Sequence, residues 1–428
     1  MISIKKEKFI AKLIDEIENQ NYPIFLTGPA GVGKTTLLKE LKQKLNTRGH
    51  NVALCSTTGI SAMNIGGGTI HKFMAINVQT KTEYIKYMKF NFQFSALKKR
   101  LAKFDIICID EISMLRADQF ELICLLLKEA TGIDKLFGGK KIIFTGDFFQ
   151  IPPVVKYQDV IKDQWIFNSP SWLNSHVKIY ELTRVFRQKN EFFVKCLNQI
   201  KLGIYDDKNV KKLFEYCTKN KPNNNSTRFF STNEECDKYN EKKLNQIKSK
   251  EYVYKAVITG KRKQHNKDAI QRECIAKPIL KLKKGAKVII VFNDPKNRFV
   301  NGTKAEVVDL TEKDVTVMIN DINKIIKLKN HTWLKTNFSG RKIASFKQIP
   351  LILSYALTIH KSQGMTLNSI VIDCKNIFAY GQLYVAMSRV TDYHNLSLIN
   401  FDKSKIIASK SVYRYYKSAK INQVYIKD

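Results

Sequence analysis

The chain has 428 residues, 44% of them hydrophobic and 11% aromatic, which is enough to bury more than one core and argues against a single compact domain. Its formal net charge of +35, from 73 Lys and Arg against 38 Asp and Glu, favours a polyanionic partner such as nucleic acid, with a generally solvated lysine-rich surface as the alternative. No run approaches the roughly 18 apolar residues of a membrane span, which argues against an integral membrane protein.

The first half of the chain is predicted to form a parallel α/β sheet. An apolar face at helical spacing precedes the short buried strand PIFLTG, which begins at Pro23 and ends in a glycine loop. A second helix follows that loop, and later buried strands are predicted at NVALCST from Asn51, FDIICID from Phe104 and KKIIFTGD from Lys140. The order strand, helix, strand implies parallel strands covered by helices on both faces. Ligands of such sheets bind at the carboxyl ends of the strands.

The α/β pattern restarts after about residue 185, and a segment of different character interrupts it. Residues 271–344 read as short β-rich runs separated by Asn, Asp and Gly turns, which predicts a small SH3-like β-barrel. The predicted fold class is therefore α/β, with two parallel-sheet domains in tandem and an insertion in each. The first domain is predicted to span 1–66 and 101–185, with a small insertion at 67–100, and the second 186–270 and 345–428, with the barrel at 271–344.

The segment GPAGVGKTT, from Gly28 to Thr36, matches the P-loop pattern and lies between a predicted strand and a predicted helix. Glycines let backbone N–H groups wrap phosphates, and the start of the following helix adds partial positive charge. Lys34 is expected to reach the outer phosphates of ATP, and the Thr35 hydroxyl is expected to bind Mg²⁺. The predicted ATP-binding residues are Gly28, Ala30, Gly31, Val32, Gly33, Lys34, Thr35 and Thr36. A chance glycine turn before a helix is the alternative.

Two further strand ends carry candidate catalytic groups. IICIDEISM delivers Asp110 and Glu111 to the sheet edge, where one carboxylate can hold Mg²⁺ and its neighbour can orient and deprotonate a water. We assign the metal to Asp110 and the water to Glu111, with a surface turn as the alternative. GDFFQIPPV places Gln150 where an amide could sense the terminal phosphate. A turn with two core phenylalanines and strand-ending prolines is the alternative there.

Phosphoryl transfer builds negative charge that an arginine can stabilise. Arg187 in LTRVFRQ and Arg389 in YVAMSRV are the candidates, because both lie among apolar residues in the second predicted α/β domain, which begins at residue 186. A solvated role is the alternative for each. The predicted catalytic set is therefore Lys34, Glu111, Gln150, Arg187 and Arg389.

The ordered motifs resemble those of superfamily 1 helicases, and they are most similar to the Pif-type branch, which is related to RecD. They are GPAGVGKTT, STTGISA, GGGTIHKF, IDEISM, GDFFQIPPV, LTRVFRQ, YALTIHKSQGMTL and GQLYVAMSRV, spread over roughly residues 23 to 400. The resemblance implies two RecA-like domains with ATP between them, 5′-to-3′ translocation on single-stranded DNA and duplex unwinding. It also implies roles in DNA replication, recombination, repair or genome maintenance, including telomere maintenance.

The resemblance further implies DNA contacts by Thr58, His71, Thr358 and His360, although the two histidines could instead be structural. The expected partners are single-stranded DNA and tailed or forked duplexes, with G-quadruplexes and RNA–DNA hybrids as further candidates, and the expected state is a monomer. The region 67–100 should carry a strand-separating wedge. The family's glutamine ahead of the P-loop, which reads adenine, is not evident in SIKKEKFIAKLIDEI.

Other functions stay open at this stage. A single-strand translocase and an RNA helicase are alternatives among motors, and a nucleic-acid-regulated P-loop ATPase switch is the alternative from another class. A nuclease is disfavoured because the sequence outside the ATP site offers no clustered metal ligands. The eight cysteines include no CxxC pair, and MISIKKEKFI is not a signal peptide. We therefore expect the cytoplasm, with nucleoid association in a bacterium.

Overall fold

The structure is a computed structural model that describes residues 1–76, 92–153, 164–222, 226–260, 264–292, 294, 298–299, 303–319, 322–336 and 342–427. Backbone contacts divide the chain into two compact units. Unit 1 comprises Met1–Lys221 and Ile377–Asp428, and unit 2 comprises Pro222–Asn376. Much of the predicted insertion at 67–100, including most of its expected wedge, lies outside the described residues. The domain limits drawn from the sequence stay predictions.

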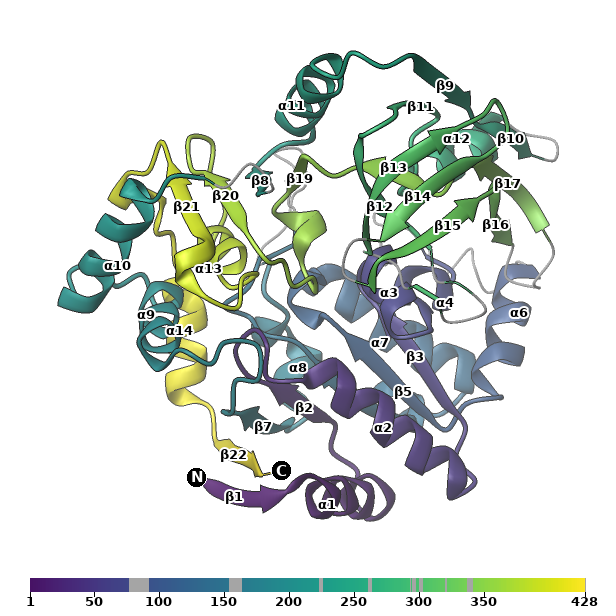
Figure 1. Ribbon diagram of the computed structural model, residues 1–428. Helices are drawn as coiled ribbons and strands as arrows, with labels where there is room; N and C mark the ends of the chain where they lie inside the picture. Colours follow the sequence, from purple (N-terminus) through teal and green to yellow (C-terminus); the bar gives the residue numbers. More distant parts are fainter. Residues whose placement is uncertain are drawn as a thin grey trace. The chain divides into compact units, whose positions relative to one another are not determined.

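Unit 1 is built on an eight-stranded sheet in which every neighbouring pair is parallel, in the order β1-β22-β7-β2-β6-β5-β3-β4. Figure 1 shows β1 and β22, the first and last strands along the chain, side by side and close to the marked chain ends. In their register Ile4 lies opposite Ile426. The strands are β1 (Ile2–Lys5), β2 (Ile24–Thr27), β3 (Val52–Ser56), β4 (Gly68–Thr69), β5 (Ile106–Asp110), β6 (Lys141–Thr145), β7 (Lys178–Leu182) and β22 (Ile421–Lys427).

Helices connect the strands of this sheet and extend beyond β7, and strand β21 (Leu396–Ile399) also belongs to unit 1. The α-helices are α1 (Lys6–Asn19), α2 (Lys34–Thr47), α3 (Gly59–Asn64), α4 (Ile70–Phe73), α6 (Phe92–Leu101), α7 (Ala117–Thr131), α8 (Pro170–Asn174), α9 (Glu191–Lys201), α10 (Lys208–Lys219), α13 (Gln382–Met387) and α14 (Lys410–Ser418). Short 3₁₀ helices are η1 (Ile112–Met114), η2 (Leu136–Gly139), η3 (Ile166–Asn168), η6 (Tyr393–Asn395) and η7 (Lys403–Lys405). No helix in the described residues has the length and apolar character needed to cross a bilayer.

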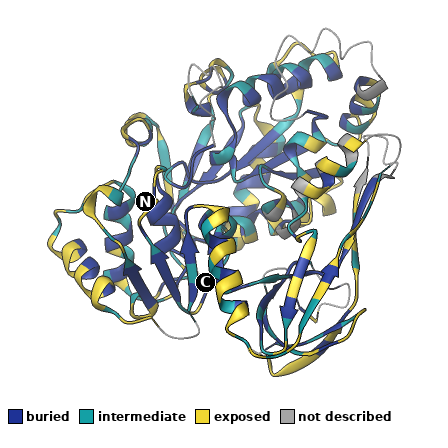
Figure 2. Ribbon diagram, turned by 90° about the horizontal axis from the view of Figure 1, so that it is seen from above, coloured by how far each residue is buried: buried dark blue, intermediate teal, exposed yellow. Residues whose placement is uncertain are grey.

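The apolar helical face predicted near the start of the chain is confirmed. Helix α1 buries Phe9, Ile10, Leu13, Ile14 and Ile17, and these side chains pack in one core with strands β2 and β7. Figure 2 shows the same division, with buried strands and with exposed colour on the outward sides of helices. Burial of these apolar side chains supplies most of the stability of such a sheet-and-helix layer.

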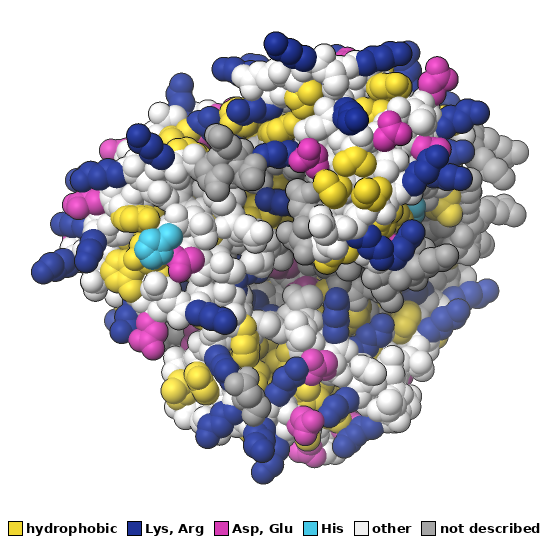
Figure 3. All heavy atoms as spheres, in the orientation of Figure 1, with side chains coloured by type: hydrophobic (Ala, Val, Ile, Leu, Met, Phe, Trp, Pro, Cys, Tyr) yellow, Lys and Arg dark blue, Asp and Glu magenta, His cyan; other side chains and the backbone are white. Residues whose placement is uncertain are grey.

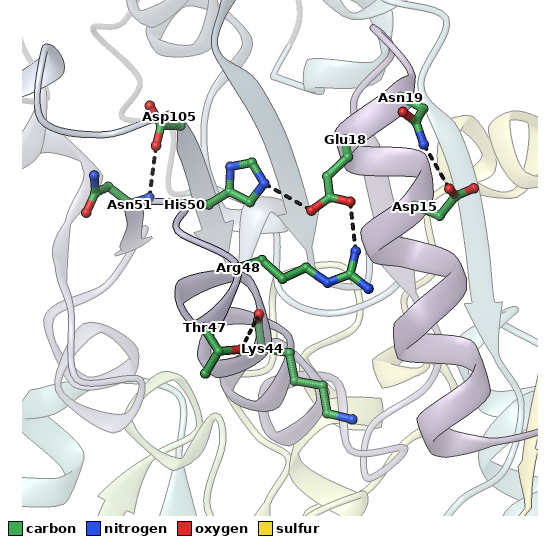
Figure 4. Close-up of polar contacts among 9 residues, drawn as sticks. All are labelled: Asp15, Glu18, Asn19, Lys44, Thr47, Arg48, His50, Asn51 and Asp105. Atoms are coloured by element: carbon green, nitrogen blue, oxygen red, sulfur yellow. Dashed lines mark hydrogen bonds and ion pairs between the residues drawn. The ribbon is translucent and has the colours of Figure 1, made fainter.

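Polar contacts hold α1 at the edge of this core. The Glu18 carboxylate accepts hydrogen bonds from Arg48 at 2.8 Å and contacts the His50 ring nitrogen at 3.1 Å, both on the connection from α2 to β3 (Figure 4). The same view shows the Asn51 backbone N–H donating to the Asp105 carboxylate at 2.9 Å. These contacts fix the loops at the amino ends of β3 and β5, so both strands deliver their carboxyl ends to the opposite edge.

Unit 2 combines a parallel sheet with antiparallel ones, which confirms the predicted mixture of parallel-sheet domains and a β-rich insertion. Strands β19, β8 and β20 are parallel neighbours. The antiparallel sheets have the orders β15-β14-β13-β12-β18, β10-β17-β16 and β11-β9. The elements are β8 (Thr227–Phe230), α11 (Asn233–Asn245), β9 (Glu251–Lys255), β10 (Val257–Gly260), α12 (Gln264–Glu273), β11 (Ile279–Lys283), β12 (Lys287–Ile290), β13 (Lys304–Leu310), β14 (Val315–Ile319), β15 (Lys324–Leu328), β16 (His331–Thr336), β17 (Lys342–Gln348), β18 (Leu351–Leu353), β19 (Ala356–Thr358), η5 (His360–Ser362) and β20 (Ile370–Asp373).

The buried aromatic Phe9 provides a test of this core. It is 1% exposed and meets the ring of Tyr180 edge-on, with centroids 5.4 Å apart. Phe9→Ala should lower the free energy of unfolding by about 3–5 kcal/mol, because it leaves a cavity that a parallel sheet cannot close. Tyr413→Ala, at a position 49% exposed on α14, should change it by less than about 0.5 kcal/mol. Urea denaturation followed by circular dichroism measures both, and equal effects would contradict this assignment of the core.

Candidate active site

The glycine loop between β2 and α2 has a backbone that only glycine accommodates. Gly28, Gly31 and Gly33 have φ values of 137°, 84° and 80°, in the left-handed region that disfavours side chains. A Cβ at Gly28 would lie 2.3 Å from the Leu182 carbonyl oxygen, and one at Gly31 would lie 2.6 Å from the Arg187 Cβ. The loop is therefore packed against the segment that follows β7, and this contact brings Arg187 to it.

Lys34 begins α2 and folds back over the loop. Its Nζ donates to the carbonyl oxygens of Gly28 at 2.6 Å and Pro29 at 3.0 Å. Burial lowers the pKa of Lys34, while the nearby carboxylates of Asp147 and Glu111 oppose that shift. The ammonium thus lies at the N-terminus of a 14-residue helix, where backbone N–H groups also favour an anion.

Asp110 ends β5 and Glu111 follows it, as the sequence predicts, but their environments differ. Asp110 is 2% exposed, and its carboxylate accepts hydrogen bonds from the Glu111 N–H at 2.9 Å, from the Ser61 hydroxyl at 3.3 Å and from the Thr145 hydroxyl. Burial raises the pKa of Asp110, and these hydrogen bonds partly offset the effect. Glu111 is only partly buried and holds a strained φ of 54°, a conformation that is typical of functional turns.

The oxygens of Asp110 and Thr35 suit a magnesium ion chemically. Mg²⁺ is usually held by one or two carboxylates together with substrate phosphates rather than by a cage of protein ligands. The described residues contain no group of three or more His, Cys, Asp and Glu that could hold a metal alone. The residues present therefore fit an ion that arrives with a nucleotide.

Strand β6 contributes Gln150 and a carboxylate that sequence reasoning missed. Asp147 is 2% exposed and Gln150 is 4% exposed, and the Gln150 amide lies 3.5 Å from the Asp147 carboxylate. Among the charges that raise the pKa of Lys34, that of Asp147 is the largest. The signal was available, because Asp147 follows a buried strand of the same parallel sheet, as Asp110 does.

Both candidate arginines lie in unit 1, beside the glycine loop. Arg389 is 2% exposed and donates to the Val385 carbonyl at 2.8 Å and the Ser388 hydroxyl at 2.7 Å, while Arg187 donates to the Ser388 carbonyl at 3.1 Å. Burial, together with the positive charge of Arg187, lowers the pKa of Arg389 to about 9. The hydrogen-bond partners of Arg389 are neutral, and the charge of Glu111 opposes the lowering of its pKa only in part. An anion that binds at this site would stabilise the buried guanidinium.

Tyrosines from the last part of the chain complete the surroundings of the loop, and sequence reasoning missed these as well. The Tyr384 hydroxyl, on α13, accepts a hydrogen bond from the Ala30 N–H at 3.1 Å. The Tyr416 hydroxyl, on α14, lies 2.7 Å from the Thr27 hydroxyl and accepts from the Phe148 N–H at 3.3 Å. Tyr416 therefore ties the end of β2 to the loop after β6.

The four residues predicted to contact DNA divide between the units. In unit 1, Thr58 accepts the Ser61 N–H at 3.2 Å, and burial and the charge of Arg116 lower the pKa of His71. In unit 2, Thr358 is 4% exposed and accepts the Lys361 N–H at 3.3 Å, and burial lowers the pKa of His360. Both histidines are thus favoured in the neutral form, which suits hydrogen bonding or base packing better than ion pairing.

The surface charge of the molecule is spread widely. Figure 3 shows Lys and Arg side chains distributed across the visible face, with fewer Asp and Glu side chains among them. This distribution agrees with a formal net charge of +35. A dispersed positive field attracts a polyanion from any direction but does not by itself define where the polyanion binds.

Known proteins resemble this chain over most of its length. The model of the PIF1-like helicase family matches residues 1–211. The ATP-dependent DNA helicase Pif1 of Bdellovibrio bacteriovorus is 30% identical over 394 residues, which cover 92% of this chain and 88% of that protein. The ATP-dependent DNA helicase Pif1 of Psychrobacter is 30% identical over 89% of this chain and is longer, so that the match covers 66% of it. The ATP-dependent DNA helicase PIF1 of Candida albicans is 28% identical over 92% of this chain, and the match covers 54% of that protein.

Solved structures match as well. The crystal structure of Pif1 helicase from Candida albicans has a TM-score of 0.83 and 29% identity, covering 97% of this chain and 99% of that one. Bacteroides sp Pif1 in complex with ADP-AlF4 has a TM-score of 0.78 and 31% identity, covering 96% of both chains. Bacteroides Pif1 bound to ssDNA has a TM-score of 0.74 and 30% identity, covering 97% of both.

The burial of Arg389, which the charge of Glu111 offsets only in part, predicts an unusual mutant. Arg389→Met should leave the thermal unfolding midpoint unchanged or raised, because a buried charge is replaced by an apolar side chain of similar length. The same change should lower ATP turnover about a thousandfold, since an arginine finger contributes at least that much. Calorimetry and a phosphate-release assay measure the two effects.

Arg228→Met is the control for this mutant. Arg228 pairs with Asp373 at 3.3 Å in unit 2, so its loss leaves a carboxylate without that cation and should lower the midpoint. Normal turnover by Arg389→Met would remove Arg389 from the site.

Proposed function

Because the chain belongs to the PIF1-like helicase family, we propose that it is an ATP-dependent DNA helicase that moves 5′ to 3′ on single-stranded DNA and unwinds duplex DNA. The observation that carries the proposal is the group of charges at the glycine loop. Lys34 is influenced by Asp147, Glu111, Asp110 and Arg187, and Arg389 by Arg187 and Glu111. A buried arginine, a partly buried arginine and a lysine that interacts electrostatically with three carboxylates suit a bound nucleoside triphosphate with its metal.

Each side chain has a defined role in the proposed ATP hydrolysis. Lys34 and the loop N–H groups bind the outer phosphates, and Thr35 and Asp110 would hold a magnesium ion, which would neutralise part of the phosphate charge. Glu111, which is less buried than Asp110, orients the attacking water and takes its proton. Gln150 is proposed to sense the terminal phosphate, and Arg187 and Arg389 to stabilise the charge that builds as the bond to that phosphate breaks.

Directional movement requires DNA contacts on more than one unit, so that one unit can release the DNA while the other stays bound. The proposed contacts meet this requirement, since Thr58 and His71 belong to unit 1 and Thr358 and His360 to unit 2. A similar protein, Bacteroides Pif1, has been crystallised with ssDNA, which supports single-stranded DNA as a partner here. Tailed and forked duplexes are the proposed substrates, with G-quadruplexes and RNA–DNA hybrids as further ones in replication, recombination, repair or telomere maintenance. We propose that the active form is a monomer.

Strand displacement on two matched partial duplexes tests the helicase and its direction together. ATP should open the duplex with a 5′ single-stranded tail and leave the one with a 3′ tail closed. Lys34→Ala should open neither, because it removes the cation that binds the outer phosphates, while its circular dichroism spectrum stays that of the wild type. A gel or fluorescence assay at one salt concentration suffices.

The other outcomes discriminate among the alternatives. Opening of only the 3′-tailed duplex would keep the motor but refute the proposed direction. DNA-stimulated ATP turnover without opening of either duplex would indicate a single-strand translocase. Turnover that single-stranded DNA does not stimulate would favour a P-loop ATPase switch.

Glu111→Gln separates nucleotide binding from hydrolysis. The variant should bind ATP with an affinity close to that of the wild type, because the phosphate ligands remain, yet turnover should fall about a hundredfold or more once the general base is lost. Glu312→Gln, an exposed position of unit 2, should keep the wild-type rate. Fluorescent-nucleotide titration and phosphate release measure the two quantities, and equal loss of binding would mean that Glu111 holds the metal instead.

A further inference from the structure

Tyr384 lies at the glycine loop without an assigned role. It is 2% exposed on α13, and its hydroxyl is 3.1 Å from the Ala30 backbone nitrogen. Ala30 stands between Gly28, whose carbonyl oxygen accepts from Lys34, and Gly31, whose missing Cβ makes room for Arg187. The phenol is therefore at the end of the loop where the lysine and the arginines meet.

The hydroxyl keeps its proton in this environment. Burial raises the pKa of Tyr384, and the Asp147 carboxylate raises it further, while the charges of Arg389 and Arg187 act in the opposite direction. Burial prevails because a phenolate is costly in a dry site. Tyr384 is thus a neutral hydrogen-bond donor at neutral pH, and it interacts electrostatically with Asp147, Arg389 and Arg187.

The donor capacity of this hydroxyl is unused by the protein. A phenol can donate one hydrogen bond and accept others. In the part of the chain that the structure describes, the hydrogen bond made by this hydroxyl is the one it accepts from Ala30. A buried O–H without an acceptor costs free energy, and at a site of this charge an incoming anion would supply the acceptor.

We propose that Tyr384 donates a hydrogen bond from its phenolic O–H to the terminal phosphate of ATP and that this bond strengthens as charge develops in the transition state. The inference rests on the proposed ATPase function. The proton stays on the phenol throughout, so Tyr384 acts as an electrostatic donor alongside Arg187 and Arg389 rather than as an acid. The Ala30 N–H, which points at the phenol oxygen, polarises the O–H and fixes its position.

Tyr384→Phe tests the proposal, with Tyr415→Phe as a matched control. Both changes delete one tyrosine hydroxyl and keep the ring, but the Tyr415 hydroxyl accepts from the Trp172 indole at 3.2 Å, away from the loop. With saturating single-stranded DNA, Tyr384→Phe should lower kcat about tenfold, as expected for a hydrogen bond to a charged group, and change the KM for ATP by less than about twofold. Tyr415→Phe should leave both constants unchanged.

Nucleotide binding gives a readout that a merely structural role would not produce. Tyr384→Phe should bind ADP like the wild type but bind ADP with aluminium fluoride about tenfold more weakly, because only the latter mimics the transferring phosphate. Equal weakening of both would mean that the hydroxyl only shapes the loop, and would overturn the proposal. An unchanged kcat would overturn it too. A wild-type protein without ATP turnover would instead refute the proposed function on which it rests.

A second variant covers the case in which Tyr384→Phe does not fold. Site-specific 3,5-difluorotyrosine at position 384 keeps the hydroxyl and nearly the same volume but makes the phenol a stronger hydrogen-bond donor. This variant should therefore bind ADP with aluminium fluoride more tightly than the wild type while its affinity for ADP stays unchanged. Equal or weaker binding of ADP with aluminium fluoride would overturn the proposal.

Discussion

The organisation of unit 1 depends on the cost of burying charge. Lys34, Asp110, Asp147 and Arg389 are largely withdrawn from water around one glycine loop. In a folded domain such charges must be paired or otherwise compensated, and here the compensation is incomplete, as the lowered pKa values of Lys34 and Arg389 indicate. The sheet, its helices and the tyrosines hold these groups in place against the cost of their desolvation. A polyphosphate ligand relieves this cost, so ligand binding and the stability of unit 1 are thermodynamically linked.

The parallel sheet is what brings these groups together. Strands β2, β6 and β5 are consecutive neighbours, so the glycine loop, Asp147 and Asp110 emerge from adjacent carboxyl ends. A one-place change in strand order would separate them by a strand width of about 4.8 Å. The core beneath is made of close-packed branched and aromatic side chains, and such cores resist small displacements. The geometry of the charged groups is therefore inherited from the sheet rather than from the loops themselves.

Sequence reasoning predicted the parts of this site that local patterns encode. The P-loop, Asp110 and Glu111 each follow a short buried strand, and hydrophobic runs with a defined end are read directly from the chain. Asp147 follows a buried strand in the same way, although the sequence prediction for this segment names only Gln150. Tyr384 and Tyr416 could not be predicted, because they reach the site through contacts with residues far away in the sequence. Tyr384 contacts Ala30 across 354 positions, and Tyr416 contacts Thr27 across 389. The division into compact units depends on the same long-range contacts, which no local pattern records.

The last strand of the chain has a consequence for how the protein is made. Strand β22 lies between β1 and β7, and Arg389, Tyr384 and Tyr416 all belong to the portion of unit 1 that follows unit 2 in the chain. During translation the glycine loop leaves the ribosome hundreds of residues before these partners do. A nascent chain therefore carries the phosphate-binding loop long before the arginine and tyrosines that surround it, and any chemistry that depends on Arg389 must wait until that residue has been synthesised and folded.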